Sequence, residues 1–308
     1  MNYENALKEI TLADERYVVM TAENRAAIRN LPSVLGDRFI DTGITEQAMI
    51  GAAAGLALRG RVPVAHALAT FLTLRAFEFV RTDAGIGNLP IKLVGGVPGF
   101  LSDANGPTHQ AVEDVALMRV IPNMYIFCPA DEQDLLIGLH QVLESPNPFY
   151  IRHNALSPVV EHDPDFEIGK AEVVSNGTDV SILVYGMLFA QAYEAKNLLE
   201  AQGKSVRLLN LRTVKPIDEA AVLRAARETR LVVTLEDHFL TGGLFSIVSE
   251  VLVRRQVTAN VLPLALVDRW FRPALLGDVL AYEGFTGPQI AEKISRKLNG
   301  QAEKKRRL

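Results

Sequence analysis

Cysteine, tryptophan and long hydrophobic runs are scarce in this chain of 308 residues, which has one cysteine and one tryptophan. A single cysteine, Cys128, excludes an internal disulfide framework and a cysteine metal cluster, as is typical of a reducing compartment. We interpret Cys128 as a small apolar residue at a strand end. The longest apolar runs reach about half of the roughly 20 residues that cross a bilayer. The charged opening "MNYENALKEITLADER" does not resemble a signal peptide. We therefore expect a cytoplasmic protein with no membrane partner.

An excess of basic charge is also lacking. The 32 lysine and arginine residues are outnumbered by 36 aspartate and glutamate residues, which leaves a formal net charge of −4. Charges of both signs are interspersed, so the sequence offers no basic stripe, and we expect no nucleic-acid partner. Because 48% of the residues are hydrophobic, a chain of this length can bury the cores of two ordinary domains.

Short β-branched runs alternate with longer helical patterns, as is typical of parallel sheets covered by helices. The periodicity is lost in "HNALSPVVEHDPDFEIGK" (153–170), which we interpret as an interdomain linker. We predict an α/β protein of two domains, each a mostly parallel sheet with helices on both faces. The predicted bounds are 1–155 for the first domain, 156–172 for the linker and 173–308 for the second domain, with a frayed end at 301–308.

The individual elements follow from the same alternation. In the first domain we expect strands at 17–21, 62–67, 91–96 and 124–128, and helices at 46–59, 71–84, 111–119 and 131–144. In the second domain the strands are expected in "DVSILVYG", "SVRLLNLR", "LVVTLED" and "NVLPLALVD". The helices there are expected at 189–202, 218–229, 243–255 and 288–298.

The stretch "DTGITEQAMIGAAAGLALRG" (41–60) places a carboxylate, Glu46, at the start of an otherwise apolar helix. One interpretation is structural, because Thr45 is a good N-cap and the helix dipole favours an acid in the first turn. The other is functional. Gly51, Gly55 and the neighbouring alanines allow a backbone or a flat ligand to approach closely. A carboxylate buried there should have a raised pKa unless something pairs with it, and such acids are functional candidates.

Three further stretches carry candidate residues, each with a simpler alternative. Phe71, Leu74 and Phe77 recur at helical spacing, which more often marks a core stripe. His109 follows a Gly-Pro turn at a helix start, where it is either a satisfied polar group or a catalyst. Arg152 ends the apolar strand in "FYIRHN", where open α/β sheets present ligand-binding residues and where salt-bridge partners are also common.

The order of these stretches resembles one family. "DRFIDTGITEQ", "PVAHALATFLTLRAF", "DANGPTHQAVEDVALMRVIPNMYIFCPADEQD" and "FYIRHN" resemble the pyrimidine-binding domain of transketolases and 1-deoxyxylulose-5-phosphate synthases. "LRTVKPIDEAAV" and "LEDHFLTGGLFSIVSEVL" are similar to their C-terminal domain. The resemblance covers nearly the whole chain and implies an enzyme that uses thiamine diphosphate.

The resemblance also implies roles for individual residues. Glu46 would hydrogen-bond the ring nitrogen of the aminopyrimidine and favour the imino tautomer, which can take the proton from the thiazolium carbon and create the ylid. Phe71 and Phe77 would flank the aminopyrimidine ring. His109 would contact substrate oxygens or shuttle protons. Arg152 would bind a phosphate or a terminal hydroxyl of a sugar.

The sequence departs from the transketolase pattern at several of these positions. Leu74 replaces the second phenylalanine of the aromatic stripe. A substrate-binding aspartate becomes Asn105, which can still hydrogen-bond a hydroxyl but carries no charge; Asp103 lies two residues away. We take both as substrate-binding candidates.

Two further departures concern the substrate end of the site. Val97 stands where an active-site histidine is expected, and Ala27 where a phosphate-binding serine is expected. His66, in the strand 62–67, either supplies the missing imidazole or is a core histidine bonded to a backbone carbonyl. The identity of the acceptor substrate is therefore open, and it need not be the usual pentose phosphate.

Half of the family's architecture has no counterpart in this sequence. Full-length members carry an N-terminal domain whose Gly-Asp-Gly segment and following asparagine hold Mg²⁺ and the diphosphate, and we nominate no metal ligands here. The resemblance therefore implies the C-terminal subunit of a split transketolase. It would act on sugars or sugar phosphates, with an N-terminal subunit as partner in an α2β2 heterotetramer that holds thiamine diphosphate and Mg²⁺.

Three functions stay open. The first is transfer of a two-carbon ketol unit from a ketose to an aldehyde acceptor. The second is another thiamine-diphosphate enzyme, either a deoxyxylulose-phosphate synthase or the beta subunit of a 2-oxo acid dehydrogenase. The third is a non-catalytic scaffold. In the second domain, "LEDH" (235–238) contains Glu236, Asp237 and His238, and we favour a structural or interface role for these three over a metal or acid/base site.

Overall fold

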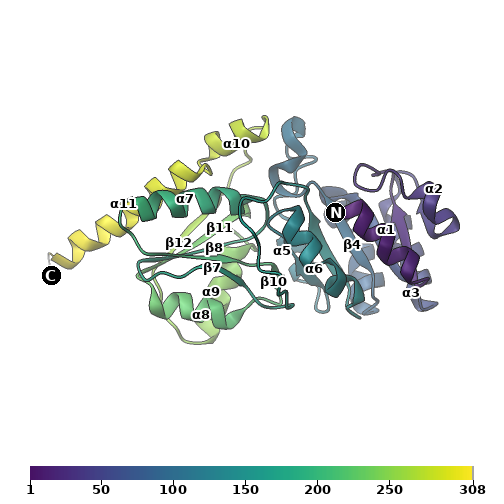
Figure 1. Ribbon diagram of the computed structural model, residues 1–308, viewed down its shortest axis with the longest axis horizontal. Coiled ribbons are helices and arrows are strands. Elements are labelled where there is room, and N and C mark those ends of the chain that lie inside the picture. Colours follow the sequence, from purple (N-terminus) through teal and green to yellow (C-terminus); the bar gives the residue numbers. More distant parts are fainter. Residues whose placement is uncertain (307–308) are drawn as a thin grey trace.

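Two β-sheets lie side by side along the long axis of the molecule (Figure 1). The computed structural model describes residues 1–306, and side chains up to residue 300. Of the expected frayed end at 301–308, residues 301–306 are helical, and 307–308 lie outside the described residues. Helices cover both faces of each sheet, which confirms the predicted α/β class with two mostly parallel sheets.

The first sheet has seven strands in the order β10-β5-β6-β4-β3-β1-β2. Their bounds are β1 Tyr17–Thr21, β2 Phe39–Asp41, β3 Val62–Leu68, β4 Lys92–Gly96, β5 Tyr125–Phe127, β6 Phe149–His153 and β10 Thr213–Lys215. All pairs are parallel except β10 with β5. β10 comes from the part of the chain expected to form the second domain, so the two halves share one sheet.

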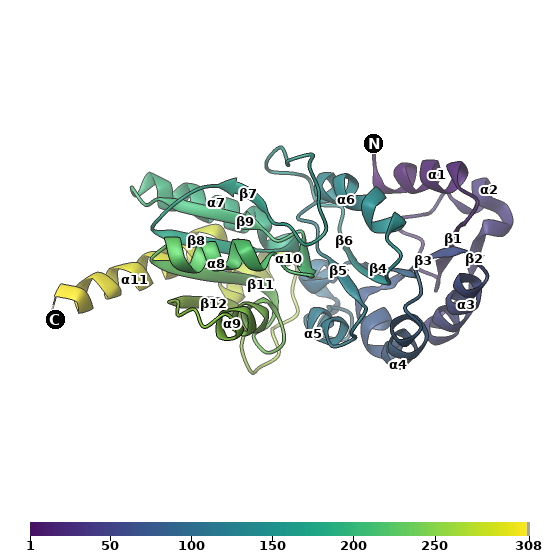
Figure 2. The ribbon, with the colours of Figure 1, turned by 90° about the horizontal axis from the view of Figure 1, so that it is seen from below.

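Helices lie on both faces of this first sheet (Figure 2). On one face are α1 and α6, and on the other α3, α4 and α5. The bounds are α1 Tyr3–Ala13, α2 Pro32–Leu35, α3 Glu46–Leu58, α4 Phe77–Phe79, α5 Asp114–Arg119 and α6 Glu132–Glu144. Shorter helical turns are η1 Gly36–Arg38, η2 Phe71–Arg75, η3 Val80–Ile86 and η4 Gly99–Asn105.

The second sheet has five strands in the order β12-β11-β8-β9-β7, with β7 antiparallel to β9. Its strands are β7 Glu172–Ser175, β8 Val180–Val184, β9 Val206–Asn210, β11 Leu231–Phe239 and β12 Val261–Leu266. Its helices are η5 Gly186–Leu188, α7 Phe189–Ala201, α8 Glu219–Glu228, α9 Leu244–Arg254, α10 Leu276–Glu283 and α11 Gly287–Arg306. Figure 1 shows α7 beside α11 on one face and α8 and α9 on the other.

Most elements that the alternation predicts are found within a few residues of their expected bounds. The main difference is 71–84, expected as one α-helix, where π-helical turns η2 and η3 flank the short α4. The three-residue strands β2 and β10 were not predicted, because so short a run carries no periodicity. Helices α1 and α10 were also missed.

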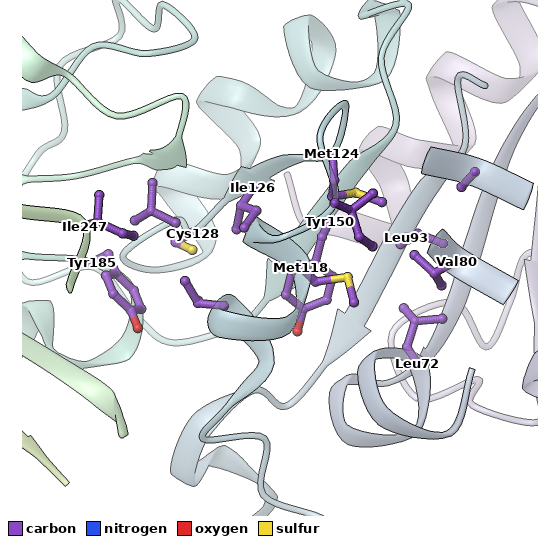
Figure 3. Packing of buried hydrophobic residues seen from close by; sticks show 14 of the residues in the cluster. Leu72, Val80, Leu93, Met118, Met124, Ile126, Cys128, Tyr150, Tyr185 and Ile247 are labelled. Atoms are coloured by element: carbon purple, nitrogen blue, oxygen red, sulfur yellow. The ribbon is translucent and has the colours of Figure 1, made fainter. Parts of the chain in front are cut away.

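One apolar core joins the two halves of the molecule (Figure 3). Met118, Ile126 and Tyr150 of the first half belong to the same buried cluster as Tyr185 and Ile247 of the second. Cys128 is also buried in this cluster, directly after β5, which confirms its interpretation as a small apolar residue. Within the described residues, no helix is both long enough and apolar enough to cross a bilayer.

Candidate active site

Glu46 begins helix α3 with a buried carboxylate. Its side chain is 2% exposed and lies in the first turn, where the helix dipole favours a negative charge. Nη1 of Arg75 donates to both carboxylate oxygens, at 3.1 Å to Oε1 and 2.9 Å to Oε2. The hydroxyl of Thr45, predicted to cap the helix, donates instead to the carbonyl of Thr42 at 2.8 Å. Arg75 thus provides the pairing that a buried carboxylate requires.

Arg75 is the residue of this site that the sequence analysis missed. It ends η2, and its side chain is 39% exposed. The guanidinium carbon lies 4.0 Å from the centroid of the Phe71 ring, a cation–π distance. One planar cation therefore covers both the carboxylate of Glu46 and a face of Phe71. The four-residue spacing between Phe71 and Arg75 could have indicated the contact, because residues at this spacing share a helix face.

His109 lies at the edge of the same ring. The centroids of His109 and Phe71 are 5.2 Å apart, with the rings inclined at 66°. Nδ1 of His109 lies 2.8 Å from the hydroxyl of Thr108. Glu46, Arg75, Phe71 and His109, which we call the Glu46 cluster, thus form a continuous series of contacts from α3, η2 and the loop before α5.

The aromatic stripe is divided between core and surface. Val80 is fully buried, and Phe77 is partly buried against the large core cluster. Leu74 is 40% exposed, and Phe71 is partly exposed beside Arg75. The simpler interpretation as core therefore holds for the later positions of the stripe, whereas Phe71 is available to a ligand.

Helix α3 presents a second, outward side that we call the α3 face. Its exposed residues are Ala48, Gly51, Ala52, Gly55 and Leu58. Leu58 is 74% exposed, and a Cβ added at Gly55 would have no atom within 4 Å. An apolar helix with one side left open is typical of a surface that packs against another element or chain.

Asp103 and Asn105, the substrate-binding candidates of η4, form hydrogen bonds within the chain. Oδ1 of Asp103 accepts from the backbone N–H of Leu276 at 2.7 Å, in the first turn of α10. Nδ2 of Asn105 donates to the carbonyl of Ser102 at 2.6 Å. Both residues are exposed. These bonds give each residue a local structural role, and substrate binding stays a prediction for both.

His66 is placed as a core histidine, which corrects its assignment as a substrate ligand. Nδ1 lies 3.1 Å from the carbonyl oxygens of Met20 and Val64, and Nε2 lies 2.9 Å from the hydroxyl of Tyr3. Because Nδ1 faces two acceptors, it carries the proton, and Tyr3 donates to Nε2. Burial lowers the pKa of His66 to about 4. Both ring nitrogens therefore already have partners.

Arg152 is also not placed to bind a substrate. Its side chain is 1% exposed, with Nε donating to Asp114 at 2.8 Å and Nη1 to Asp237 at 2.9 Å. The hydroxyl of Tyr150 donates to the same Asp114 oxygen at 2.6 Å. The predicted phosphate contact was wrong, because two buried carboxylates hold the guanidinium. The alternative of a salt-bridge partner is the one observed.

The segment Glu236, Asp237 and His238 has the structural and interface role that the sequence favoured. Asp237 pairs with Arg152 of the first half, as described above. Glu236 accepts from the backbone N–H of Leu244 and Phe245 at the start of α9, and burial raises its pKa to about 8. Nε2 of His238 accepts from the N–H of Ala116 at 3.2 Å. A Cβ at Gly243 would overlap the Glu236 carboxylate, which explains a glycine there.

Among the described residues, one group has the spacing of metal ligands: Asp134, His162 and Glu172. Nε2 and Nδ1 of His162 each lie 2.8 Å from a carboxylate oxygen, of Asp131 and Glu172 respectively, and Arg212 pairs with Asp134 at 2.6 Å. Two organic cations thus already balance the acids, and we assign no metal here. The Glu46 cluster, by contrast, fits the aminopyrimidine end of thiamine diphosphate, since it offers a buried carboxylate next to an accessible aromatic face.

Comparison with known proteins gives matches over most of the chain. Residues 1–157 match the model of the transketolase pyrimidine-binding domain, and residues 169–290 that of the transketolase C-terminal domain. The chain is 37% identical over 254 residues to the 6-deoxy-6-sulfo-D-fructose transketolase subunit of Clostridium sp. (strain MSTE9), covering 81% of this chain and 79% of that protein. It is also 37% identical over 265 residues to the 1-deoxy-D-xylulose-5-phosphate synthase of Dictyoglomus thermophilum, covering 84% of this chain but 42% of the synthase.

A solved structure gives the same result. The chain superimposes with a TM-score of 0.83 on a split gene transketolase described as an inactive beta4 tetramer. The two sequences are 33% identical, and the match covers 96% of each chain. The match therefore extends over both sheets.

Proposed function

The chain belongs to the transketolase family, at the position of the C-terminal subunit of its split enzymes, and on that premise we propose that it transfers a two-carbon ketol unit from a ketose to an aldehyde acceptor. Thiamine diphosphate, which the family uses, supplies a thiazolium carbon that becomes a nucleophile once its proton is removed. The residues of this chain hold and orient the aminopyrimidine end of that cofactor.

The buried carboxylate of Glu46 is the observation that carries the proposal. Its partner Arg75 is partly exposed and also covers the ring of Phe71. In the active complex, Glu46 would hydrogen-bond the ring nitrogen of the aminopyrimidine, and Phe71 would contact the ring. Phe77, which packs partly buried against the large core cluster, would be the second aromatic residue at the ring.

His109 is positioned for the substrate rather than for the cofactor ring. It lies at the edge of Phe71 and is partly exposed, so an oxygen of a bound ketose can reach its imidazole. An imidazole there can donate a hydrogen bond to the carbonyl oxygen and take the proton back as the carbonyl re-forms. We also keep Asp103 and Asn105, in the segment preceding His109, as candidates for substrate hydroxyls.

The partner chain completes the site. We propose that an N-terminal subunit carries the diphosphate-binding residues and Mg²⁺, and that it packs on the α3 face in an α2β2 heterotetramer. The open apolar side of α3 supports this arrangement, because it ends beside Glu46. We place the complex in the cytoplasm, in carbohydrate metabolism, with domain bounds at 1–155 and 173–308.

The test is ketol transfer by the complex reconstituted from this chain and its partner, with a ketose donor and no 2-oxo acid. We expect Glu46→Ala to lower kcat by at least about 100-fold, the usual contribution of a positioned acid or base. Glu78→Ala, at an exposed position on α4, is the matched control and should keep wild-type turnover. Full turnover in Glu46→Ala would refute the assignment.

A second function has support from the similarity to the Dictyoglomus synthase. That enzyme's name describes formation of 1-deoxy-D-xylulose 5-phosphate, and the chain spans less than half of its length. The same reconstituted complex separates the two functions: turnover that requires a 2-oxo acid and releases carbon dioxide would favour a synthase, and turnover with a ketose donor alone favours the transketolase.

A further inference from the structure

A cleft of about 430 Å³ lies at the carboxyl ends of β3, β4 and β6. Leu68, Gly96 and His153 end these three strands and line it, and Ala27 and Val97 lie on its wall. Ligands of open α/β sheets bind at this edge. Leu68 precedes Phe71 of the Glu46 cluster by three residues in the sequence.

The wall of this cleft is mostly apolar and lacks a cation. None of its eleven lining residues, all in the described part of the chain, is lysine or arginine. Ala27 and Val97, the two departures from the family pattern at the substrate end, both belong to it. Val97 has a φ of +46°, which is rare for a β-branched residue, and such strain is concentrated at functional sites.

Two arginines adjoin lining residues in sequence: Arg25, which pairs with Asp41, and Arg152, which faces away from the cleft. Successive residues of a strand point to opposite faces of the sheet. Tyr150 and Arg152 of β6 point toward Asp114 and the second domain. Phe149, Ile151 and His153 point to the other face, where Phe149 and Ile151 join the cluster under α1 and α6. The strand thus places His153 in the wall of the cleft and Arg152 on the opposite face of the sheet.

His153 has an unused hydrogen-bonding atom at this position. The residue is 8% exposed, and its Nε2 has no hydrogen-bond partner among the described residues. The ring is fixed edge-on against Tyr3, with centroids 4.6 Å apart. Burial lowers the pKa of His153 to about 4, so the imidazole is neutral at pH 7. A buried polar atom without a partner is costly and usually indicates a missing ligand or water.

We propose that this cleft holds the uncharged, hydroxyl-bearing end of a sugar substrate, with Nε2 of His153 as its hydrogen-bond partner. The identification of the ligand as a sugar rests on the proposed function. A hydroxyl can donate to or accept from a neutral imidazole. A phosphate dianion, by contrast, needs paired cations when it leaves water, and the cleft provides none. The complex therefore prefers non-phosphorylated acceptors.

Binding to the chain itself tests the site without requiring turnover, because the cleft and His153 belong to this chain. The chain has six histidines, so the ring nitrogens of a ¹⁵N-histidine sample can be assigned by single substitutions. We expect titration with D-xylulose to shift the Nε2 resonance of His153 in a saturable way. D-xylulose 5-phosphate should bind at least tenfold more weakly. No shift with D-xylulose, or tighter binding of the phosphate, would overturn the proposal.

Three variants separate hydrogen bonding from fold effects. His153→Leu should weaken D-xylulose binding by about three- to tenfold, the effect of one neutral hydrogen bond, and His153→Gln should restore part of it. Ala27→Lys places an ammonium in the cleft and should reverse the preference between xylulose and its phosphate. Unchanged binding in folded His153→Leu would show that His153 is not the partner.

Kinetics of the reconstituted complex distinguish this proposal from the proposed function. With one ketose donor, kcat/KM for D-glyceraldehyde should exceed that for D-glyceraldehyde 3-phosphate, and His153→Leu should raise KM for the former with little change in kcat. If ketol transfer fails but the His153 shift persists, the cleft assignment holds and the function falls. If transfer proceeds with a preference for the phosphate, the cleft assignment falls and the function holds.

Discussion

The guanidinium of Arg75 binds the carboxylate of Glu46 and covers the ring of Phe71 at the same time. These are the two groups that an aminopyrimidine needs, a carboxylate for its ring nitrogen and an aromatic face. A planar cation can occupy this position because it satisfies both at once. Under the proposed function, Arg75 therefore lies where the aminopyrimidine would bind, and it keeps the buried carboxylate paired.

Replacing Arg75 by glutamine should tighten the binding of thiamine diphosphate to the reconstituted complex, because the cofactor no longer competes with the guanidinium. The free energy of unfolding of the chain should fall by about 1–3 kcal/mol, because the buried Glu46 carboxylate loses its charged partner. Calorimetric titration with cofactor measures the first effect and urea unfolding the second. Arg81→Gln, an exposed arginine of η3, is the control. Weaker cofactor binding in Arg75→Gln alone would make Arg75 a cofactor ligand instead.

The α3 face should be the surface that the partner subunit covers. Leu58→Arg puts a charge on this apolar face and should prevent assembly of the complex without unfolding the chain, because Leu58 is 74% exposed. Val253 of α9 in the second domain is 77% exposed. Val253→Arg is therefore the control, because it adds the same charge at an apolar position of similar exposure. Light scattering of each variant mixed with the partner reports the assembly. Equal effects of the two substitutions would contradict the assignment of the interface.

The sequence predicts the fold well because regular elements of five or more residues repeat their pattern several times. The strands β1, β3 and β8 and the helices α3 and α6 all have the expected bounds within two residues. Three-residue strands such as β10 have no repeat to detect. β10 also joins the first sheet, whereas its neighbours in sequence, β9 and β11, belong to the second. Such pairing depends on tertiary contacts that local patterns do not contain.

The site is predicted less completely, for a reason that differs from residue to residue. Glu46 and Phe71 are linked through Arg75, which lies 29 residues from Glu46 in sequence, and local spacing does not show that contact. Arg152 was assigned to a ligand because its carboxylate partners, Asp114 and Asp237, lie 38 and 85 residues away. His66 was open for the same reason, since Tyr3 is 63 residues away. Charge pairing between distant segments decides whether a polar side chain is free, and one sequence does not show it.

The buried pair of Arg152 and Asp237 should matter more to stability than a surface pair across the same two halves. Asp237→Ala leaves a buried guanidinium with one carboxylate fewer, and we expect a loss of about 3–5 kcal/mol in the free energy of unfolding. Arg119 and Glu250 form a partly exposed pair between α5 and α9, and Glu250→Ala should cost at most about 1 kcal/mol. Urea unfolding of both variants gives the comparison. Similar losses would show that the buried pair adds no more than a surface pair does.

Stability should fall as the solution becomes alkaline, because of His162. Hydrogen bonds to the carboxylates of Asp131 and Glu172 outweigh its burial and raise the pKa of His162 to about 10, from an ordinary value of 6.5. Asp134 also faces the ring and acts in the same direction. Below pH 6.5 both folded and unfolded chains carry this proton, so the stabilisation is complete. Above it the unfolded chain loses the proton first, and the stabilisation declines until the folded chain deprotonates near pH 10.

Lys92 acts in the opposite direction, so the contribution of His162 has to be measured separately. The variant His162→Gln does this. Burial lowers the pKa of Lys92 to about 7, so its cost to the folded state diminishes as the pH rises. The difference in unfolding free energy between wild type and His162→Gln removes the effect of Lys92, since both proteins share it. We expect this difference to be largest near pH 6 and to shrink toward pH 10. His140, which is 70% exposed on α6, gives the control His140→Gln, and its difference from wild type should stay small at every pH. A constant difference for His162→Gln would mean that the ring is neutral in the fold and that the acids are balanced by Arg212 alone.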